Sequence, residues 1–186
     1  MDYHGEKIRL RAIERADLPR YVGWFADSAV SENLSSQIPM SLAQEERWYE
    51  GILQQPAEEQ PLAVDAKLGR GKWEHIGGAG YHLIDKRNRL AECGLFIGPA
   101  KYRNRGYGRD MLLTLLRYGF QTLNLHRVQL RVMEYNARAV HLYEKIGFVR
   151  EGTMRDAHFH QGRYWGMHLY AILQGEWEAR YGAPKE

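Results

Sequence analysis

The chain has one cysteine in 186 residues, so it cannot form an internal disulfide. The stretch Ala91-Glu92-Cys93-Gly94-Leu95 is typical of a strand and not of a redox or metal site. No apolar run approaches the ~20 residues that a membrane-spanning helix needs. Met1 to Arg11 is too polar and charged for a signal peptide. These absences favour a cytoplasmic protein that has no membrane partner.

Charge of one sign is also scarce. Lys and Arg together number 26 and Asp and Glu number 23, which gives a net charge of +3. A nucleic-acid-binding domain concentrates Lys and Arg on one element, whereas these charges are scattered along the chain. We therefore expect no nucleic-acid partner. The small positive balance is compatible with an anionic ligand such as a polyphosphate.

The length fits one domain, and no repeat, low-complexity segment or linker divides the sequence. We therefore predict a single domain over residues 1–186, in the order βααβββαβαββ. The first half is expected to contain a strand over 7–13, a helix from Leu18 capped by Asp17, an irregular loop over 27–40, and a helix that begins with a Ser41–Gln44 capping box and runs through Leu53. Three antiparallel strands over 62–68, 76–84 and 90–97 follow, and then a helix over 107–123 and a strand over 127–133. The chain is expected to end with a helix from Asn136 to Gly147 and a hairpin over 148–157 and 164–173 that turns at Gln161-Gly162.

The helix over 107–123 has the clearest pattern of polar and apolar positions. The pattern predicts a polar face made of Asp110, Thr114, Arg117 and Gln121, and a buried face made of Leu112, Leu113, Leu116, Phe120 and Leu123.

A glycine-containing motif, Arg103-Asn104-Arg105-Gly106-Tyr107-Gly108, joins the end of a strand to this helix. Glycines leave backbone N–H groups open to an anion, and a helix N-terminus adds partial positive charge. Arg103, Arg105 and Arg109 add full charges, so the motif predicts a phosphate or pyrophosphate site. The alternative is a simple glycine turn into a helix. The motif lacks the third glycine of a dinucleotide fingerprint and the Gly-Lys-Ser/Thr of a P-loop.

A second motif, Asn136-Ala-Arg-Ala-Val-His-Leu-Tyr143-Glu-Lys-Ile-Gly147-Phe148, begins 28 residues after Gly108. Alone it is a capped amphipathic helix with a glycine stop. Together the two motifs resemble the acetyl-CoA-binding half of the GNAT superfamily of N-acetyltransferases. The resemblance covers residues 76–173 and extends plausibly from Lys7 onward. The stretch from Asn124-Leu125-His126-Arg127 through Gly162-Arg163-Tyr164 most resembles bacterial spermidine N-acetyltransferases, and after them the ribosomal-protein N-terminal acetyltransferases.

The resemblance implies a mixed α/β fold with a central, mostly antiparallel twisted sheet and helices on both faces. It implies parallel, splayed strands at 90–97 and 127–133, with the pantetheine arm of acetyl-CoA lying between Leu95-Phe96-Ile97 and residues 130–133. The pyrophosphate is expected on the backbone N–H groups of Arg103, Asn104, Arg105, Gly106, Tyr107 and Gly108, with Arg109 beside them. Asn136 is expected to contact the pantetheine and Tyr143 to lie near the thioester. Residues 90–150 then form the acetyl-CoA part, and residues 14–60 and 150–173 the acceptor side.

The implied reaction is direct acetyl transfer from acetyl-CoA, as co-substrate, to a primary amine. Tyr143 can protonate the departing thiolate, and its alternative is a core aromatic. Glu92 and Glu134 are candidate bases, although each can equally be an ordinary solvated or ion-paired carboxylate. Positioning of the two reactants can supply much of the acceleration. Cys93 is a poor nucleophile because no His is suitably placed in the sequence to activate it.

The acceptor side suggests a weakly charged substrate. Residues 26–40 contain only Asp27 and Glu32 as acids, so we expect a neutral or singly charged amine, such as a peptide N-terminus, an amino sugar or a small metabolite. Spermidine is the alternative acceptor, and a non-catalytic CoA-binding module is the alternative of another class. We expect a dimer if the chain assembles with itself. Two other expectations concern residues 158–168. We expect surface or packing roles for His158, His160 and His168 rather than a metal site, and a core position in preference to an acceptor pocket for Tyr164 and Trp165.

Overall fold

A computed structural model describes residues 2–34, 38–69 and 71–182. In these residues eight strands form one hydrogen-bonded sheet in the order β1-β2-β3-β4-β5-β6-β8-β7. The strands are β1 (Tyr3–His4), β2 (Ile8–Ala12), β3 (Leu62–Gly69), β4 (Lys72–Asp85), β5 (Leu90–Ile97), β6 (Arg127–Met133), β7 (Val149–His160) and β8 (Arg163–Leu173). The α-helices are α1 (Leu18–Phe25), α2 (Ser28–Ser31), α3 (Leu42–Ile52), α4 (Tyr107–Arg117), α5 (Ala137–Ile146) and α6 (Gln174–Tyr181). This mixed α/β architecture confirms the predicted fold class.

The residue contacts divide the chain into two compact units. The first comprises Met1–His82 and Gly94–Leu115, and the second comprises Leu83–Cys93 and Leu116–Glu186. Each unit is described by itself. None of the helices in the described ranges is both long and apolar enough to span a membrane.

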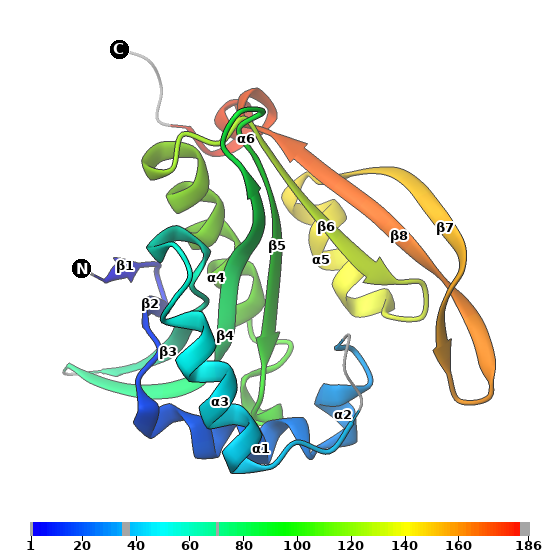
Figure 1. The fold of residues 1–186 in the computed structure, drawn as a ribbon. Helices are drawn as coiled ribbons and strands as arrows, with labels where there is room; N and C mark the ends of the chain where they lie inside the picture. Colours follow the sequence, from blue (N-terminus) through cyan, green and yellow to red (C-terminus); the bar gives the residue numbers. More distant parts are fainter. Residues whose placement is uncertain (1, 35–37, 70, 183–186) are drawn as a thin grey trace. The chain divides into compact units, whose positions relative to one another are not determined.

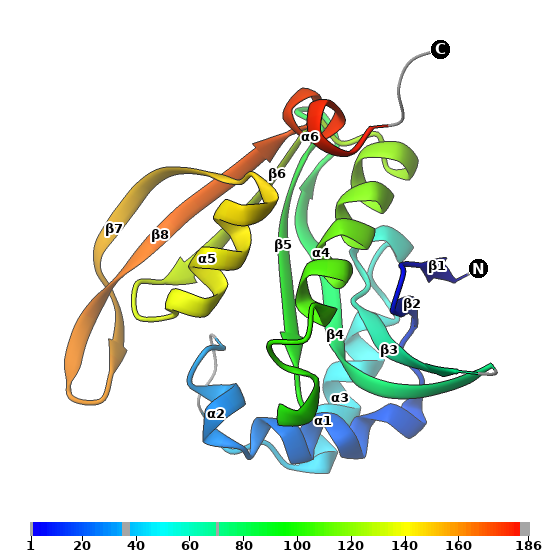
Figure 2. The ribbon, with the colours of Figure 1, turned by 180° about the vertical axis from the view of Figure 1, so that it is seen from behind.

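In the first unit, β2 pairs antiparallel with β1 and β3, and β3 pairs antiparallel with β4. Ile8 and Leu10 of β2 are fully buried and alternate with Arg9 and Arg11, as the period-two pattern predicted. Figures 1 and 2 view the chain from opposite sides and show α1 and α3 on one face of β4 and α4 on the other. The core beneath α1 and α3 contains Ile13, Leu18, Tyr21, Tyr49, Ile52 and Ala63.

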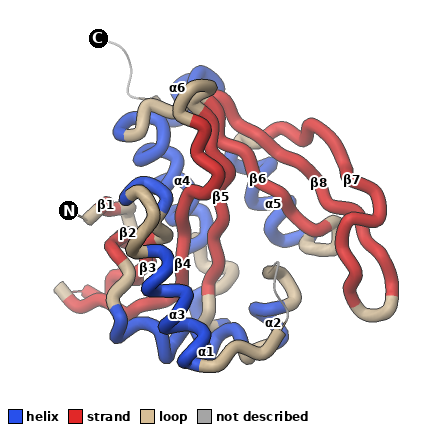
Figure 3. The backbone as a smooth tube through the Cα atoms, viewed as in Figure 1, coloured by secondary structure: helices blue, strands red, loops and turns tan. Residues whose placement is uncertain are grey.

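In the second unit, the start of β5 pairs parallel with the start of β6, from Leu90↔Arg127 to Glu92↔Gln129. The predicted parallel pairing is therefore confirmed. β8 pairs antiparallel with both β6 and β7, and Figure 3 shows β7 and β8 as a long strand hairpin. Gln161 and Gly162 turn this hairpin with positive φ angles of 50° and 79°. Helix α5 packs against β8, where the Tyr170 hydroxyl donates to Glu144.

Local chemistry explains where the helices begin and end. The Ser41–Gln44 capping box is present, with each residue's backbone N–H donating to the other's side chain. Asn136 caps α5 by accepting from the N–H of Ala139, and Gly147 ends it at a φ of 115°. The expected cap at Asp17 is wrong. Its carboxylate accepts from the N–H of Glu14 and pairs with Arg11, so it makes no side-chain cap to α1.

Four features differ from the expected element order. The loop predicted over 27–40 contains α2, which Asp27 caps by accepting from the N–H of Ala29; positions 35–37 lie outside the described residues. The chain turns between β3 and β4 with positive φ at Gly69 and Gly71, and Arg70 lies outside the described residues. The short β1 and the C-terminal α6 were not predicted. The helix predicted over 107–123 changes at Tyr118 into a π-helical turn that ends at Thr122.

The predicted polar face of α4 is only half correct. Arg117 and Gln121 are exposed, but Asp110 and Thr114 are buried. Asp110 is buried because the backbone of the turn between β1 and β2 covers it and donates hydrogen bonds to its carboxylate. A carboxylate whose hydrogen-bonding capacity is satisfied can occupy the inner face of a helix, and helical periodicity alone does not reveal such a partner.

Candidate functional site

The loop from Arg103 to Gly108 leads into α4 and belongs entirely to the first unit. Asn104 and Gly106 have positive φ angles of 58° and 85°. At Gly106 a Cβ would meet only the Lys7 amino group, at 3.3 Å. Left-handed residues within such a loop turn successive N–H groups toward one side and form an anion-binding concavity. The loop therefore has the backbone geometry of an anion site at a helix N-terminus.

Cations surround this loop, but they are not the ones that the sequence suggested. The Lys7 amino group donates to the carbonyl of Arg105 at 3.0 Å and lies 5.6 Å from the centre of the Tyr107 ring. Arg105 and Arg109 are exposed, whereas the guanidinium of Arg103 donates to the carbonyls of Ile97 and Gly98 at 3.3 and 2.6 Å. Arg103 therefore secures the end of β5, and Lys7 supplies a charge that the motif did not predict.

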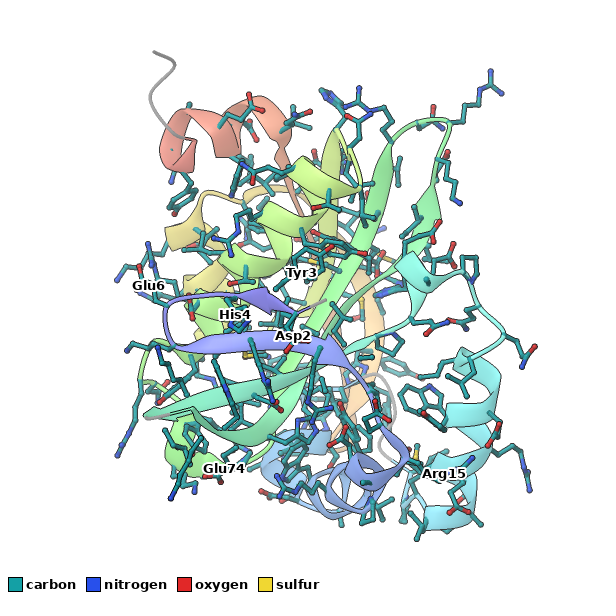
Figure 4. The ribbon with its side chains drawn as sticks, turned by 90° about the vertical axis from the view of Figure 1, so that its left-hand side faces the viewer. Asp2, Tyr3, His4, Glu6, Arg15 and Glu74 are labelled. Carbon is teal, nitrogen blue, oxygen red and sulfur yellow. The ribbon has the colours of Figure 1, made fainter. Side chains whose placement is uncertain are left out.

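Asp110 positions Lys7. Its carboxylate accepts from the backbone N–H groups of Glu6, Lys7 and Ile8 at 3.0, 2.7 and 3.1 Å. A Cβ on Gly5 would collide with the same carboxylate, so this approach requires a glycine. Figure 4 shows His4 and Glu6 at this edge, where β1 turns into β2. The Arg103–Gly108 loop and the first strand pair are thus tied together through the first turn of α4.

The β5 residues Leu95, Phe96 and Ile97 are half-buried, as strand residues beside a ligand can be. The N–H of Gly98, just after the strand, donates to the carbonyl of Ile76 at 2.9 Å. The Trp24 ring of α1 rests directly on Gly98, because a Cβ there would collide with the indole. Helix α1 and the predicted pantetheine strand are therefore in contact within the first unit.

In the second unit, Tyr143 lies on the inner face of α5 and is buried. Burial raises the pKa of its hydroxyl, and the neighbouring Cys93 contributes in the same direction. A tyrosine in this state holds its proton, as a general acid must before it donates, although the raised pKa also makes the donation less favourable. Asn136 is half-buried, and its side-chain oxygen already caps α5.

Both candidate bases have hydrogen-bond partners in the second unit. The buried Glu92 accepts from Nε of Arg131 at 2.8 Å, in an ion pair whose Arg side chain is half-exposed. Glu134 accepts from the backbone N–H of Gly166 at 3.0 Å and so helps to hold β8. These contacts agree with the ion-paired or structural alternative for each residue, without testing either as a base.

Cys93 is buried beside Glu92, and burial raises the pKa of its thiol to about 12. A thiol with this pKa supplies almost no thiolate near neutral pH. The chemistry of the side chain thus agrees with direct transfer, in which the enzyme forms no acyl intermediate.

The histidines and aromatic residues near the β7–β8 turn pack on one another. The rings of His158 and His160 lie 5.9 and 4.9 Å from that of Tyr135, and Nδ1 of His168 is 2.8 Å from the Thr153 hydroxyl. Among the described residues, no group of three or more His, Cys, Asp or Glu is placed to hold a metal ion. The expectation of a core position is wrong for Tyr164, which is 63% exposed and packs on Phe159 of the same hairpin.

A buried ionic network joins the start of α1 to β2 and β3. The Asp65 carboxylate accepts from Nε of Arg9 and Nε of Arg11 at 2.9 and 2.8 Å, and Arg11 also pairs with Asp17 at 2.7 Å. Hydrogen bonds from His75 and the two arginines hold the pKa of Asp65 well below its usual value despite its burial. The network lines a polar cavity of about 310 Å³. It fixes α1 over β2 and β3 and so fixes the position of Trp24.

Comparison with known proteins agrees with this geometry. A family model for the acetyltransferase (GNAT) domain matches residues 7–149. The spermidine N(1)-acetyltransferase of Vibrio cholerae serotype O1 is 31% identical over 172 residues, which cover 92% of this chain and 95% of that protein. A putative ribosomal N-acetyltransferase of Bacillus subtilis is 32% identical over 97 residues, which cover 52% of each protein. The solved structure of a V. cholerae spermidine N-acetyltransferase in complex with CoA and spermine has a TM-score of 0.83, at 28% identity, and covers 92% of this chain and 98% of that chain.

Proposed function

The chain belongs to the GNAT acetyltransferase family, and on this premise we propose that it acetylates a neutral or singly charged primary amine. It is an acetyl-CoA-dependent N-acetyltransferase with a small-molecule amine acceptor, like the relatives to which it is similar. The observation that supports the cofactor side of the proposal is the loop before α4. Its left-handed Asn104 and Gly106 lie beside the amino group of Lys7.

The loop residues fit a nucleotide pyrophosphate. Backbone N–H groups at the start of α4 offer partial positive charge, and the exposed Arg105 and Arg109 with Lys7 offer full charges. We assign the pyrophosphate to these groups and the pantetheine arm to Leu95, Phe96 and Ile97, with Asn136 as a further contact. Arg103 acts indirectly, since its guanidinium holds the carbonyls at the end of β5.

Acetyl-CoA, when bound, supplies the activated acetyl group as a thioester. Tyr143 holds a proton on its hydroxyl oxygen and is assigned the role of donating it to the departing sulfur. Glu92 is the assigned proton acceptor. It pairs with Arg131, whose half-exposed side chain can turn toward solvent when Glu92 takes up a proton.

The acceptor is assigned from charge. Relatives named spermidine acetyltransferases act on a polycation, and a polycation is best held by several carboxylates. In residues 26–40 the chain offers Asp27 and Glu32 only. The Asp27 carboxylate already caps α2 and lies 3.9 Å from the Arg103 guanidinium, which reduces its attraction for a second cation. Spermidine remains the alternative acceptor.

The experiment that tests the proposal measures binding and transfer separately. Calorimetry with acetyl-CoA is expected to show one site per chain. A panel of peptides, amino sugars, small monoamines and spermidine is then screened for release of free thiol. Binding of acetyl-CoA without thiol release from any amine would favour a non-catalytic CoA-binding module and contradict the proposed activity.

A further inference from the structure

A buried carboxyl group lies on the inner face of α3. Glu45 is only 2% exposed and follows the same helical stripe as the buried Tyr49 and Ile52, at spacings of four and three residues. Tyr49 and Ile52 belong to the apolar core under α1 and α3. Among residues 2–34, 38–69 and 71–182, the Glu45 side chain has no hydrogen-bond or ion-pair partner.

Such a position is unfavourable for the free protein. A carboxyl that leaves water without a hydrogen-bond partner loses solvation that its surroundings do not replace. Burial accordingly raises the pKa of the Glu45 carboxyl above its ordinary value. A cation bound beside the group offsets this cost, because an opposite charge stabilises a desolvated carboxylate. None of the steps assigned to the cofactor loop, Tyr143 or Glu92 uses this group.

Aromatic rings surround the neighbouring Tyr21. Its ring centre lies 5.6 Å from that of Trp24, 6.0 Å from Phe25, 6.4 Å from Trp48 and 5.8 Å from Phe96. The Tyr21 hydroxyl is buried and makes no hydrogen bond with the described residues. Burial is the main reason that its pKa is raised. Tyr49 and Ile52, which share the inner stripe of α3 with Glu45, belong to the same core cluster as Tyr21, so Glu45 lies beside this cluster.

The rings are open enough to meet a ligand. Trp48 of α3 is 39% exposed, and Trp24, Phe25 and Phe96 are partly buried. Phe96 belongs to β5, and Trp24 covers Gly98 at the end of that strand. The cluster therefore adjoins the strand assigned to the pantetheine arm, and it lies entirely within the first unit.

We propose that Glu45 is the counter-ion for the ammonium group of the acceptor, with Trp24, Phe25 and Trp48 as the aromatic walls around it. Ring faces attract ammonium groups, and a desolvated carboxylate strengthens that attraction. One carboxylate matches one charge, so this site favours a monoamine with an apolar or aromatic body over a polyamine. The inference rests on the proposed function and adds a specificity-determining residue to it.

The test uses 2-phenylethylamine as a singly charged probe and 2-phenylethanol as its uncharged counterpart. Quenching of tryptophan fluorescence reports binding directly, because Trp24 and Trp48 belong to the site, and thiol release gives KM and kcat. For Glu45→Gln we expect amine affinity to fall at least tenfold, KM to rise in parallel, and the affinities for 2-phenylethanol and acetyl-CoA to stay within twofold. Glu45→Asp is expected to recover part of the amine affinity because it keeps the charge.

The control is Glu50→Gln, the same change at an exposed position of the same helix, where the native carboxylate pairs with Arg15. Glu50→Gln is expected to leave the affinities for 2-phenylethylamine and 2-phenylethanol unchanged. Equal amine affinity in wild type and Glu45→Gln, or equal loss of the amine and the alcohol, would overturn the role of Glu45. Amine binding is measured without acetyl-CoA, so it tests the Glu45 site separately from acetyl transfer. If the amine binds through Glu45 and no acetyl transfer occurs, the assigned amine site is still supported. In that case it is the proposed activity that fails.

Discussion

Tyr143 is the residue whose chemistry the structure makes most testable. Its hydroxyl is buried with a raised pKa, so it is protonated throughout the neutral range. For Tyr143→Phe we predict acetyl-CoA affinity within a few-fold of wild type and turnover reduced by ~10²-fold if the hydroxyl is the general acid. Tyr170→Phe removes another tyrosine hydroxyl from the same unit, one that donates to Glu144, and serves as the control. Equal turnover of wild type and Tyr143→Phe would make Tyr143 a packing residue.

Glu92 can be tested against a second glutamate that also pairs with an arginine. Glu92→Gln removes the assigned proton acceptor, so we predict kcat reduced by ~10²-fold with acetyl-CoA affinity unchanged. Glu151 also pairs with an arginine, Arg127, but at an exposed position. Glu151→Gln should therefore leave kcat unaltered. If both variants keep full kcat in thiol-release assays, the Glu92–Arg131 pair is structural.

Asp65 links the stability of the first unit to pH. Its folded-state pKa is depressed, so the carboxylate stabilises the fold at every pH above its unfolded pKa, and this contribution disappears as acid protonates it. We predict that the free energy of unfolding declines as pH falls below about 4, the ordinary pKa of Asp. Asp65→Asn should cost ~3–5 kcal/mol at pH 7, because it leaves Arg9 and Arg11 without their buried partner, and should flatten the acid dependence.

Denaturant titrations between pH 3 and pH 7 check this prediction, with Asp2→Asn as the control. Asp2 pairs with the same Arg9, but its side chain is 35% exposed, against 4% for Asp65. An exposed pair contributes ~0–1 kcal/mol, so this variant should unfold almost like wild type. Figure 4 shows Asp2 just before β1, alongside β2. An equal effect of the two substitutions would argue against the buried network as the source of the acid sensitivity.

At the scale of elements, the junction between β5 and α4 contains the assigned cofactor site. Gly106→Glu would place a carboxylate where the pyrophosphate is assigned, so we predict loss of acetyl-CoA binding by calorimetry. A side chain at a φ of 85° is also strained. Gly162→Glu controls for this strain, since Gly162 has a φ of 79°, open space around it and no assigned ligand. Unchanged affinity in a folded Gly106→Glu variant would contradict the assigned site.

The same junction shows what a sequence pattern can and cannot predict. The glycines, the helix start and the caps at Ser41 and Asn136 depend on neighbouring residues, so the sequence predicted them. The role of Lys7 could not be predicted, because the loop carbonyl that it contacts lies 98 positions further along the chain. Asp110 was wrongly assigned to an exposed polar face because its hydrogen-bond donors, the backbone N–H groups of residues 6–8, are also distant in the sequence.

Helix α3 is a second element whose buried face the sequence pattern did not reveal. The sequence placed Trp48, Tyr49, Ile52 and Leu53 along this helix, yet the Trp48 and Leu53 side chains are 39% and 45% exposed. The inner stripe is Glu45, Tyr49 and Ile52, and a glutamate is not counted as a core residue in a hydrophobic pattern. The pattern therefore could not show the carboxylate on this helix that the acceptor proposal needs.

At the scale of the whole molecule, net charge separates the two candidate acceptor classes. A net charge of +3 gives no long-range attraction for a polycation. We predict that kcat/KM for the best monoamine exceeds that for spermidine, and that kcat/KM for the monoamine changes little with salt. Steady-state assays at two ionic strengths measure both. A kcat/KM for spermidine that is higher by an order of magnitude would show that family resemblance is a better guide than charge.

The fold of the whole chain was the most predictable level. Two motifs separated by one strand were enough to indicate the GNAT family, which the match to residues 7–149 confirms. Strands β5 and β6 have the predicted bounds because their alternation is clear and Pro99 ends the first of them. The short β1 could not be predicted, because its two paired residues are held by their partners Leu10 and Arg9 and are too few to show a pattern.

The attachment of the first strand pair to α4 has a practical consequence for producing the protein. Asp110 holds the backbone of residues 6–8, and Lys7 contacts the cofactor loop directly. A purification tag fused just before Asp2 is therefore tethered a few residues from the assigned nucleotide site, and a polyhistidine tag there adds ligand-binding groups of its own. Affinities for acetyl-CoA measured on such a fusion would describe the tag together with the enzyme. A cleavable tag avoids this artefact.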